Sequence, residues 1–238
     1  IYECAAIARF FEKKYPEVVA ALNLDHGGTY EQGVQAIHAG FSSIMVDRST
    51  LPFEENVAQV RELVKIAHAV GVSVESELGH VGQGDAYAET RDSGLTRLDE
   101  AQAFVEQTHT DCLAVAVGTS HGVYKGAPRL EFNLLSELAR ELPLPLVLHG
   151  GSGTGDDNLV KAIACGIQKI NLNTDLNEGG LAKLNVSCQN GFTREVKGAN
   201  GEMNTKRMNL QQTIQTAVDG WMETLKYYMT LFGSANRI

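Results

Sequence analysis

Short apolar runs alternate along the chain with longer segments that carry apolar residues at helical spacing. The strand-like runs lie at residues 18–24, 42–46, 72–78, 112–117, 144–149 and 167–172. The helix-like segments between them cover residues 30–40, 53–71, 98–109, 132–143 and 156–166. Several of these segments open on a polar residue and close on glycine or proline, as helix ends do. Repetition of strand, loop and helix predicts βαβ units that build a parallel sheet.

Two architectures of parallel sheet fit this alternation. A doubly wound open sheet favours a GxGxxG loop after its first strand, and the sequence has none there. A (β/α)8 TIM barrel places its chemistry on loops that follow many different strands. Charged or polar residues end nearly every predicted strand: Asp25, His26, Asp47, Glu75, Glu77, His121, His149 and residues 171–175. This distribution favours the barrel.

The alternation predicts six strands, whereas a (β/α)8 barrel needs eight. The sequence opens without methionine in helix-like residues, so we expect two strands before Ile1 and a second barrel helix at residues 1–16. The strand at 18–24 should then have one neighbour among the six. One alternative is that another chain covers the open edges of the sheet. The other is that residues 178–205 contain the strands that the pattern does not reveal.

The final quarter of the chain departs from the alternation. Residues 176–205 are polar and dotted with glycine, which predicts a loop that is mobile or dependent on packing. Residues 209–234 predict a closing helix with Gly233 as its stop. We therefore expect one barrel domain over residues 1–238, in which residues 177–238 form a C-terminal helical extension.

Composition narrows the class of protein. The 238 residues are 43% hydrophobic and 21% charged. No apolar run approaches the roughly 18 residues that cross a bilayer. The net charge of −9 argues against a nucleic-acid partner, so a cytoplasmic protein without a membrane partner is expected. The four cysteines lack CxxC spacing, and the apolar surroundings of Cys112 and Cys165 predict buried free thiols.

Three histidines stand at predicted strand ends, and each precedes a glycine: His26, His121 and His149. Three neutral imidazoles with an open coordination position suit a catalytic divalent metal such as zinc. A capping or packing role is the alternative for any single histidine, but it explains the shared pattern poorly. The remaining four histidines lie mainly on predicted helices or a loop and receive no role.

Carboxylates occupy the same strand ends. Asp25 adjoins His26, so it could reach a substrate hydroxyl while the histidine holds the metal. Asp47 and Glu77 could provide a second metal position or orient the ligands. An ion pair or a loop cap is the alternative for both of them.

Two glycine- and amide-rich stretches follow the last two predicted strands. They read "HGGSGTG" from His149 and "NLNTD" from Asn171. Backbone N–H groups at this place in a barrel often bind phosphate, and Lys125 is available from a neighbouring loop. The glycines alone are weak support, because glycine-rich turns are common.

Six stretches in order resemble the class II, metal-dependent ketose-bisphosphate aldolases, which act on fructose or tagatose bisphosphate. They are "ALNLDHGG", "PFEENV", "VESELG", "DCLAVAVGTSHGVYKG", "LVLHGGSG" and "INLNTDL". The resemblance runs from the start to about residue 176 and more loosely to the closing "FGS". It implies a (β/α)8 barrel that forms a homodimer or homotetramer.

The resemblance also implies roles for individual residues. His26, His121 and His149 correspond to ligands of Zn²⁺, with Asp47 and Glu77 at an alternative position for zinc or a second divalent or monovalent cation. Asp25 corresponds to the acid/base that handles the C4 hydroxyl proton. Positions that contact the dihydroxyacetone phosphate half are Gly122, Gly150, Gly151, Ser152, Asn171, Asn173 and Thr174, with Lys125 in the same phosphate region.

The implied reaction is a reversible aldol cleavage of a ketose 1,6-bisphosphate to dihydroxyacetone phosphate and glyceraldehyde 3-phosphate. Fructose 1,6-bisphosphate is favoured over tagatose 1,6-bisphosphate because of Asn173 in "NLNTDL". The sequence departs from the family in the loop after "ELG", which often carries a second catalytic carboxylate in a GGxED stretch. Asp85 is the nearest match, with Glu89 behind it, and its side chain is one methylene shorter than glutamate.

Two rival interpretations stay open. Lys169 lies two residues before Asn171 on the last strand and could act as a Schiff-base nucleophile. The alternative for Lys169 is an ion pair with a carboxylate in the barrel floor. A barrel that binds a sugar phosphate without catalysis is the second rival, and the complete set of three histidines with Asp25 argues against it.

Overall fold

The structure, a computed structural model, describes residues 1–84 and 91–235. Six parallel strands form one sheet in chain order: β1 (Asn23–Gly27), β2 (Ser43–Val46), β3 (Ser73–Leu78), β4 (Cys112–Val115), β5 (Leu146–Leu148) and β6 (Ile167–Ile170). Every strand pairs in parallel with the next strand along the chain. This order is that of successive right-handed βαβ units. The sheet curls into a half-barrel, which confirms the α/β class and fits a partial TIM barrel.

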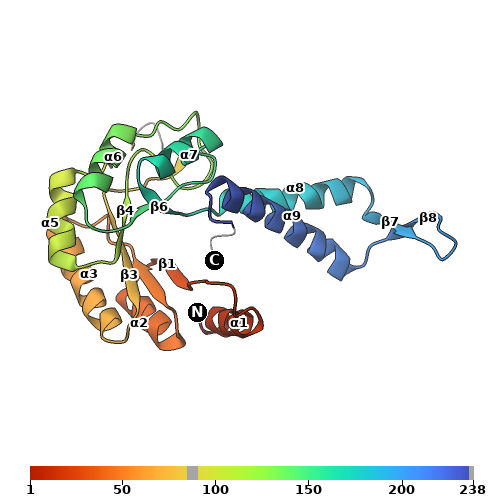
Figure 1. The fold of residues 1–238 in the computed structure, drawn as a ribbon, viewed down its shortest axis with the longest axis horizontal. Coiled ribbons are helices and arrows are strands. Elements are labelled where there is room, and N and C mark those ends of the chain that lie inside the picture. Colours follow the sequence, from red (N-terminus) through yellow and green to blue (C-terminus); the bar gives the residue numbers. More distant parts are fainter. Residues whose placement is uncertain (85–90, 236–238) are drawn as a thin grey trace. The chain divides into compact units, whose positions relative to one another are not determined.

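Helices connect successive strands and cover the outer face of the curled sheet (Figure 1). They are α2 (Tyr30–Ala39), α3 (Phe53–His68), α5 (Leu98–Thr108), α6 (Phe132–Glu141) and α7 (Asp156–Ala164). Each of them has been predicted from the sequence, with ends that differ by a few residues. Helix α1 (Tyr2–Lys14) precedes the sheet, as the helix-like opening of the chain predicts.

The core lies between the sheet and these helices. Its fully buried side chains include Ile44, Leu63, Phe104, Leu113 and Leu148. Strand alternation divides β3 between two faces, because Glu75 and Glu77 share one side while their neighbours face the other. The same strands that build the core therefore carry carboxylates onto the inner side of the sheet.

The first strand is displaced from its predicted position. Residues 18–22 precede β1, which begins at Asn23, so the predicted strand at 18–24 was placed too early. Val18 and Val19 are exposed, and their apolar character therefore does not mark a buried strand. Among the described residues β1 pairs with β2 alone, which agrees with the expected single neighbour. The position of two further strands stays a prediction.

The predicted loop at 176–205 is wrong. Helix α8 (Thr174–Gln189) and an antiparallel hairpin of β7 (Thr193–Lys197) and β8 (Met203–Arg207) occupy this stretch. Helix α9 (Leu210–Leu231) follows and begins with a capping box between Asn209 and Gln212. The chain divides into two compact units, Ile1–Asn171 and Leu172–Arg237. The hairpin strands belong to a separate sheet, so they add none to the half-barrel.

In the described part of the chain, no helix combines the length and the apolar character that crossing a membrane requires. The four cysteines are free. Cys112 and Cys165 are half-buried rather than fully buried, which corrects the expected burial but not the expected thiol state.

Candidate metal centre and active site

The three predicted ligand histidines meet at one place. His26 lies in β1, His121 follows β4 and His149 follows β5 directly. Their ring centroids are 4.9 Å apart for His26 and His121, 4.6 Å for His26 and His149, and 5.7 Å for His121 and His149. One nitrogen from each ring lies within 4.8 Å of the other two. Residues far apart in sequence thus present three imidazoles to one point.

Neighbouring carboxylates determine which nitrogen of each ring carries a proton. His149 Nε2 lies 2.8 Å from Glu75 Oε1, and His26 Nδ1 lies 3.2 Å from Asp47 Oδ2. A carboxylate accepts, so each of these nitrogens donates an N–H. In neutral rings the remaining nitrogens, His149 Nδ1 and His26 Nε2, then carry lone pairs, and they are 2.8 Å apart. A proton or a metal cation between them relieves this opposition.

His121 completes the donor set. Its Nε2 is buried and has no hydrogen-bond partner within the part of the chain that the structure describes. Burial and the nearby His26 and His149 lower the pKa of His121 to about 4, so the ring is neutral at physiological pH. A neutral His121 with an unpartnered buried nitrogen, next to the rings of His26 and His149, fits a divalent metal bound through nitrogen.

A bulge in β1 brings two neighbouring side chains to the site. Leu24 pairs with Ile44 and Gly27 with Val46, so β1 has one more residue than β2 between these pairs. Within the bulge His26 has φ of 49°, a left-handed conformation that non-glycine residues rarely adopt. Bulges re-aim side chains beside active sites. Asp25 and His26 therefore both reach the centre, although they would face opposite sides of a regular strand.

Asp25 lies beside the imidazole cluster. Its Oδ1 is 4.0 Å from His26 Nε2, and its side chain is 54% exposed. Asn171 Nδ2 donates to the same carboxylate at 3.1 Å. A carboxylate that is open to solvent and held next to a metal-binding cluster is suited to moving a proton on a bound substrate.

Asp47 and Glu77 meet at the other side of His26, and the three form a second possible ligand group. Burial opposes the charge of Asp47, but hydrogen bonds from His26 and Ser49 hold the pKa of its carboxyl well below the usual range. The hydrogen bond to Asp47 in turn raises the pKa of His26. Burial, followed by the charge of Asp47, raises the pKa of Glu77 to about 7. Glu77 Oε2 lies 3.6 Å from His149 Nδ1 but has no hydrogen-bond partner among the described residues, so it can take a proton or a cation.

Glu75 belongs to the site, although the sequence reasoning gave it no role. It is 1% exposed, contacts His149 through Oε1 and pairs with Lys169 Nζ through Oε2 at 2.8 Å. The hydrogen bond from His149 and the charge of Lys169 outweigh burial and lower the pKa of Glu75. Strand alternation places it on the face of Glu77, which is the signal that could have found it. The predicted ion pair between Lys169 and a carboxylate is confirmed.

The glycine loop after β5 is tied to the loop that carries His121. Tyr124 Oη donates to Gly150 O at 3.0 Å and accepts from Ser120 N at 2.7 Å. Gly150 has φ of 66°, and a side chain there would collide with the carbonyl of Ser120. Ser152 is buried nearby in sequence. Backbone contact between the two loops thus fixes the relative position of His121 and His149.

The other expected substrate-binding residues have varied surroundings. Gly151 N donates to Asn171 O, while Gly122 and Lys125 are exposed on the His121 loop. Asn173 precedes α8 and Thr174 is its first residue, both in the second unit. Asp85 and Glu89 lie outside the described residues. These roles in substrate binding and catalysis stay predictions.

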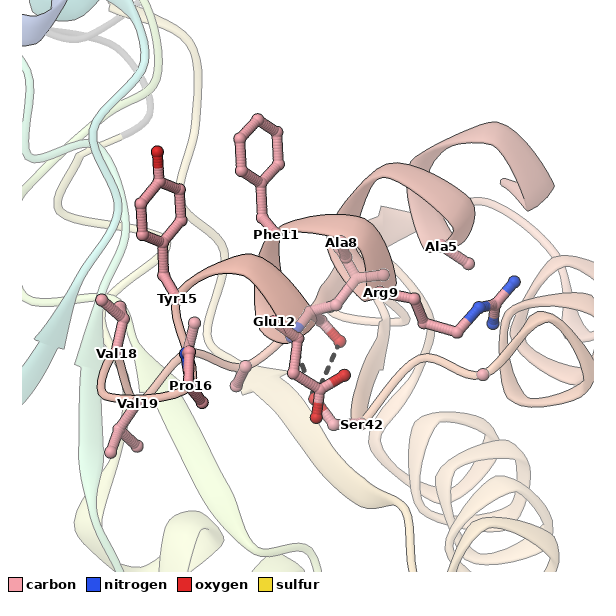
Figure 2. A pocket seen from close by; sticks show the side chains of 14 residues that line it. Ala5, Ala8, Arg9, Phe11, Glu12, Tyr15, Pro16, Val18, Val19 and Ser42 are labelled. Atoms are coloured by element: carbon pink, nitrogen blue, oxygen red, sulfur yellow. Dashed lines mark hydrogen bonds between the residues drawn. The ribbon is translucent and has the colours of Figure 1, made fainter.

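A cavity of about 560 Å³ lies away from these loops, beside α1 (Figure 2). Phe11 of α1 and Tyr15, directly after the helix, project on one side of the cavity, and Arg9 points away from them to donate to Ala39 O. Leu22 and Ser42 also line the cavity, and hydrogen bonds join the backbone of Leu22 to the Ser42 hydroxyl. None of the three histidines is among the residues that line this cavity.

Comparison with known sequences identifies the family. The family model described as fructose-bisphosphate aldolase class-II matches residues 2–237. A probable fructose-bisphosphate aldolase of Bacillus subtilis is 46% identical over 175 residues, which cover 72% of this chain and 60% of that protein. The chain therefore spans less than two thirds of that relative. A fructose-bisphosphate aldolase of Staphylococcus aureus is 41% identical over 92% of this chain and 72% of its own length.

Solved structures agree with the sequence relatives. The YdjI aldolase of Escherichia coli K12 superposes with a TM-score of 0.81 at 28% identity, over 99% of this chain and 77% of that one. The fructose-bisphosphate aldolase of Campylobacter jejuni shares the fold, with a TM-score of 0.79 at 21% identity over all of this chain and 77% of that one. The resemblance noted in the sequence is confirmed, and the chain belongs to the class II fructose-bisphosphate aldolase family.

Proposed function

We propose that the protein catalyses the reversible aldol cleavage of fructose 1,6-bisphosphate to dihydroxyacetone phosphate and glyceraldehyde 3-phosphate. The observation that carries this proposal is the convergence of three imidazoles beside an exposed carboxylate, Asp25. Relatives at 38–46% identity are named fructose-bisphosphate aldolases or probable ones, which favours this substrate. Tagatose 1,6-bisphosphate is the alternative substrate, because the two sugars differ only in the configuration at C4.

We propose that His26, His121 and His149 hold Zn²⁺, with Asp47 and Glu77 as a position for a second or displaced cation. When bound, the metal would act as a Lewis acid that polarises the ketose carbonyl. Asp25 accepts the proton of the C4 hydroxyl as the C3–C4 bond breaks. The electron pair of that bond passes to C3, in the half that becomes dihydroxyacetone phosphate. The amide of Asn171 holds the Asp25 carboxylate in place for this transfer.

In the condensation direction a second carboxylate must remove a proton from C3 of dihydroxyacetone phosphate, and we assign this role to Asp85. We also propose that the phosphate half of the substrate contacts a set of small, amide and cationic residues. They are Gly122, Lys125, Gly150, Gly151, Ser152, Asn171, Asn173 and Thr174. A cytoplasmic homodimer or homotetramer is the expected state of the protein.

The test measures metal content and turnover together. Purified protein should contain close to one tightly bound divalent metal per chain and cleave fructose 1,6-bisphosphate, with activity lost to chelator and restored by Zn²⁺. His149→Ala should lose both the metal and turnover, whereas His38→Ala on α2 should keep both. Equal tight zinc in His149→Ala and the parent would overturn the ligand assignment. Faster turnover of tagatose 1,6-bisphosphate would change the substrate and leave the chemistry intact.

A further inference from the structure

Lys169 contacts two different parts of the candidate site. Its Nζ lies 2.8 Å from Glu75 Oε2 and 2.6 Å from Asn171 Oδ1. Glu75 is 1% exposed and His149, on the other oxygen of that carboxylate, is fully buried. A buried carboxylate needs compensating partners, since removal of one partner from such a group is strongly destabilising. Lys169 provides the positive charge that keeps Glu75 ionised and able to accept from His149.

The same ammonium decides how the Asn171 amide is oriented. An ammonium can only donate, so the atom that contacts Lys169 must be the amide oxygen. The amide NH₂ then points the other way, where Nδ2 donates to Asp25 Oδ1 at 3.1 Å. His149 Nε2 lies 3.2 Å from the same Nδ2, but this is a contact without a hydrogen bond, because Nε2 uses its own N–H toward Glu75. With the amide reversed, its oxygen would face the carboxylate of Asp25 and repel it.

We propose that Lys169 is a positioning residue that orients a metal ligand and the acid/base residue at once. Through Glu75 it fixes the proton of His149 on Nε2, which leaves Nδ1 for the metal. Through Asn171 it fixes the carboxylate of Asp25 beside the imidazole cluster. This inference rests on the proposed function for the role of Asp25, while its effect on His149 concerns metal binding alone.

The geometry argues against Lys169 as the nucleophile of a Schiff base. A nucleophilic amine must be uncharged with an exposed lone pair. Here the nitrogen directs its N–H groups to a carboxylate and an amide oxygen, so the contacts hold it as a hydrogen-bond donor rather than as a nucleophile. The Lys169 side chain is 39% exposed, so a substrate carbonyl could reach it. The two contacts of its nitrogen, rather than burial, argue against the reaction.

Three variants of the full chain separate the two branches. Lys169→Met removes both contacts. Lys169→Arg keeps the positive charge near Glu75 but replaces the compact ammonium that donates to Asn171. Lys65→Met on α3 is the matched control. We expect Lys169→Met to weaken zinc binding about 10- to 100-fold in chelator competition, which is the usual effect of removing a residue that holds a metal ligand in place. Lys169→Arg should restore most of the zinc affinity and yet keep a reduced kcat with little change in KM. The control should match the parent.

A spectroscopic measurement reads the His149 proton without any turnover. In nitrogen-15 spectra of histidine-labelled, metal-free protein, the resonance of His149 Nε2–H should be present in the parent and lost or shifted in Lys169→Met. Unchanged zinc affinity and an unchanged His149 resonance in Lys169→Met would overturn the proposal. So would borohydride trapping of dihydroxyacetone phosphate on Lys169. Absence of aldolase turnover in the parent would refute the proposed function, and the zinc and nitrogen-15 results would still decide the His149 branch.

Discussion

The two compact units of the chain are stabilised in different ways. In residues 1–171 large apolar side chains fill the space between sheet and helices, and the candidate site stands on the strands that pass through this core. In residues 172–237 the buried positions among those described are Leu176, Gly180 and Gly220. Helices α8 and α9 instead approach each other closely through glycines, with Gly179 and Gly180 facing Ala217, Gly220 and Thr224.

This contrast separates two kinds of sensitivity. In the first unit a lost side chain leaves a cavity, and a shift of a strand moves a functional group with it. In the second unit there is little side-chain volume to lose, and an added methyl group is the larger perturbation. In the first unit, substitutions at the exposed functional groups should therefore change the chemistry with little effect on stability, whereas truncations in the core should reduce stability. In the second unit, added side-chain atoms between the helices should reduce stability.

The largest expected effect concerns Asp25, which contributes almost nothing to the core. Asp25→Ala should lower kcat by roughly 10²- to 10⁴-fold, the usual contribution of a general acid–base group. Metal content and thermal stability should stay close to those of the parent, since Asp25 is exposed and is not one of the three imidazole ligands. Steady-state assays with metal analysis measure this, and a near-normal kcat would move the role to another residue.

A glycine-to-alanine pair tests the contrast in packing directly. In Gly220→Ala the added Cβ would lie 2.5 Å from the backbone oxygen of Gly179, which cannot move without separating the helices. We expect a loss of about 1–3 kcal/mol in the second unit. In Gly33→Ala on α2 the new Cβ meets Leu63 and Val46 side chains at 3.0 and 3.1 Å. These ends can shift, and the gain of about 1 kcal/mol in helix propensity offsets much of the crowding.

Hydrogen exchange of α8 and α9 amides measures the outcome for each variant. Gly220→Ala should accelerate exchange in these two helices and leave β3, β4 and β5 protected. Equal protection in parent and variant would contradict the close packing of α8 on α9.

A smaller effect is expected from the pH dependence of the metal-free protein. Glu77, whose pKa is raised from 4.5 to about 7, binds more protons when folded, so its contribution to stability falls as pH rises through this range. His121, whose pKa is lowered from 6.5 to about 4, binds fewer protons when folded, so its contribution rises over an overlapping range. In Glu77→Gln the opposing contribution is gone, and stability should rise more steeply with pH between 4.5 and 6.5.

Denaturant unfolding of chelator-treated protein at several pH values measures this slope. The difference from the parent should stay below about 1.4 kcal/mol per pH unit, the limit for one proton. Glu55→Gln on the exposed side of α3 is the matched control. Parallel pH profiles for Glu77→Gln and the parent would contradict the raised pKa of Glu77.

The smallest effect belongs to the start of α9. Asn209 Oδ1 accepts from Gln212 N at 2.9 Å, and Gln212 Oε1 accepts from Asn209 N at 3.0 Å. Asn209→Ala should cost about 1 kcal/mol, as removal of a helix cap does. Asn209→Asp keeps the acceptor and should restore the loss. Hydrogen exchange in the first turn of α9 distinguishes the two variants. Identical exchange rates would contradict a stabilising role of the Asn209 side chain as helix cap.

The sequence predicts the half-barrel and the meeting of His26, His121 and His149 because both follow from strand positions. Each histidine ends or follows a strand, and the carboxyl ends of parallel strands share one edge of a sheet. It does not predict the bulge in β1, since one additional residue in a strand leaves no mark on an apolar run. The first strand is predicted too early for another reason: Val18 and Val19 are apolar, as strand residues often are, and yet both are exposed.

Helix α8 and the hairpin were missed for a different physical reason. Gly179 and Gly180 weaken helix propensity, and their purpose is close contact with a helix about 40 residues later. Strands β7 and β8 are mostly exposed on both faces and therefore lack the apolar alternation that reveals a half-buried strand. In both cases the interaction that fixes the structure is non-local.

The left-handed backbone of His26 has a consequence for how this protein would respond to selection. Such a conformation costs roughly 1–2 kcal/mol for a residue with a side chain, and glycine escapes that cost. A library of variants at position 26 that is sorted for heat resistance without metal should therefore enrich glycine and asparagine. The same library sorted for zinc-dependent aldolase activity should return histidine. The residue that the left-handed backbone at position 26 favours for stability therefore differs from the residue that activity requires.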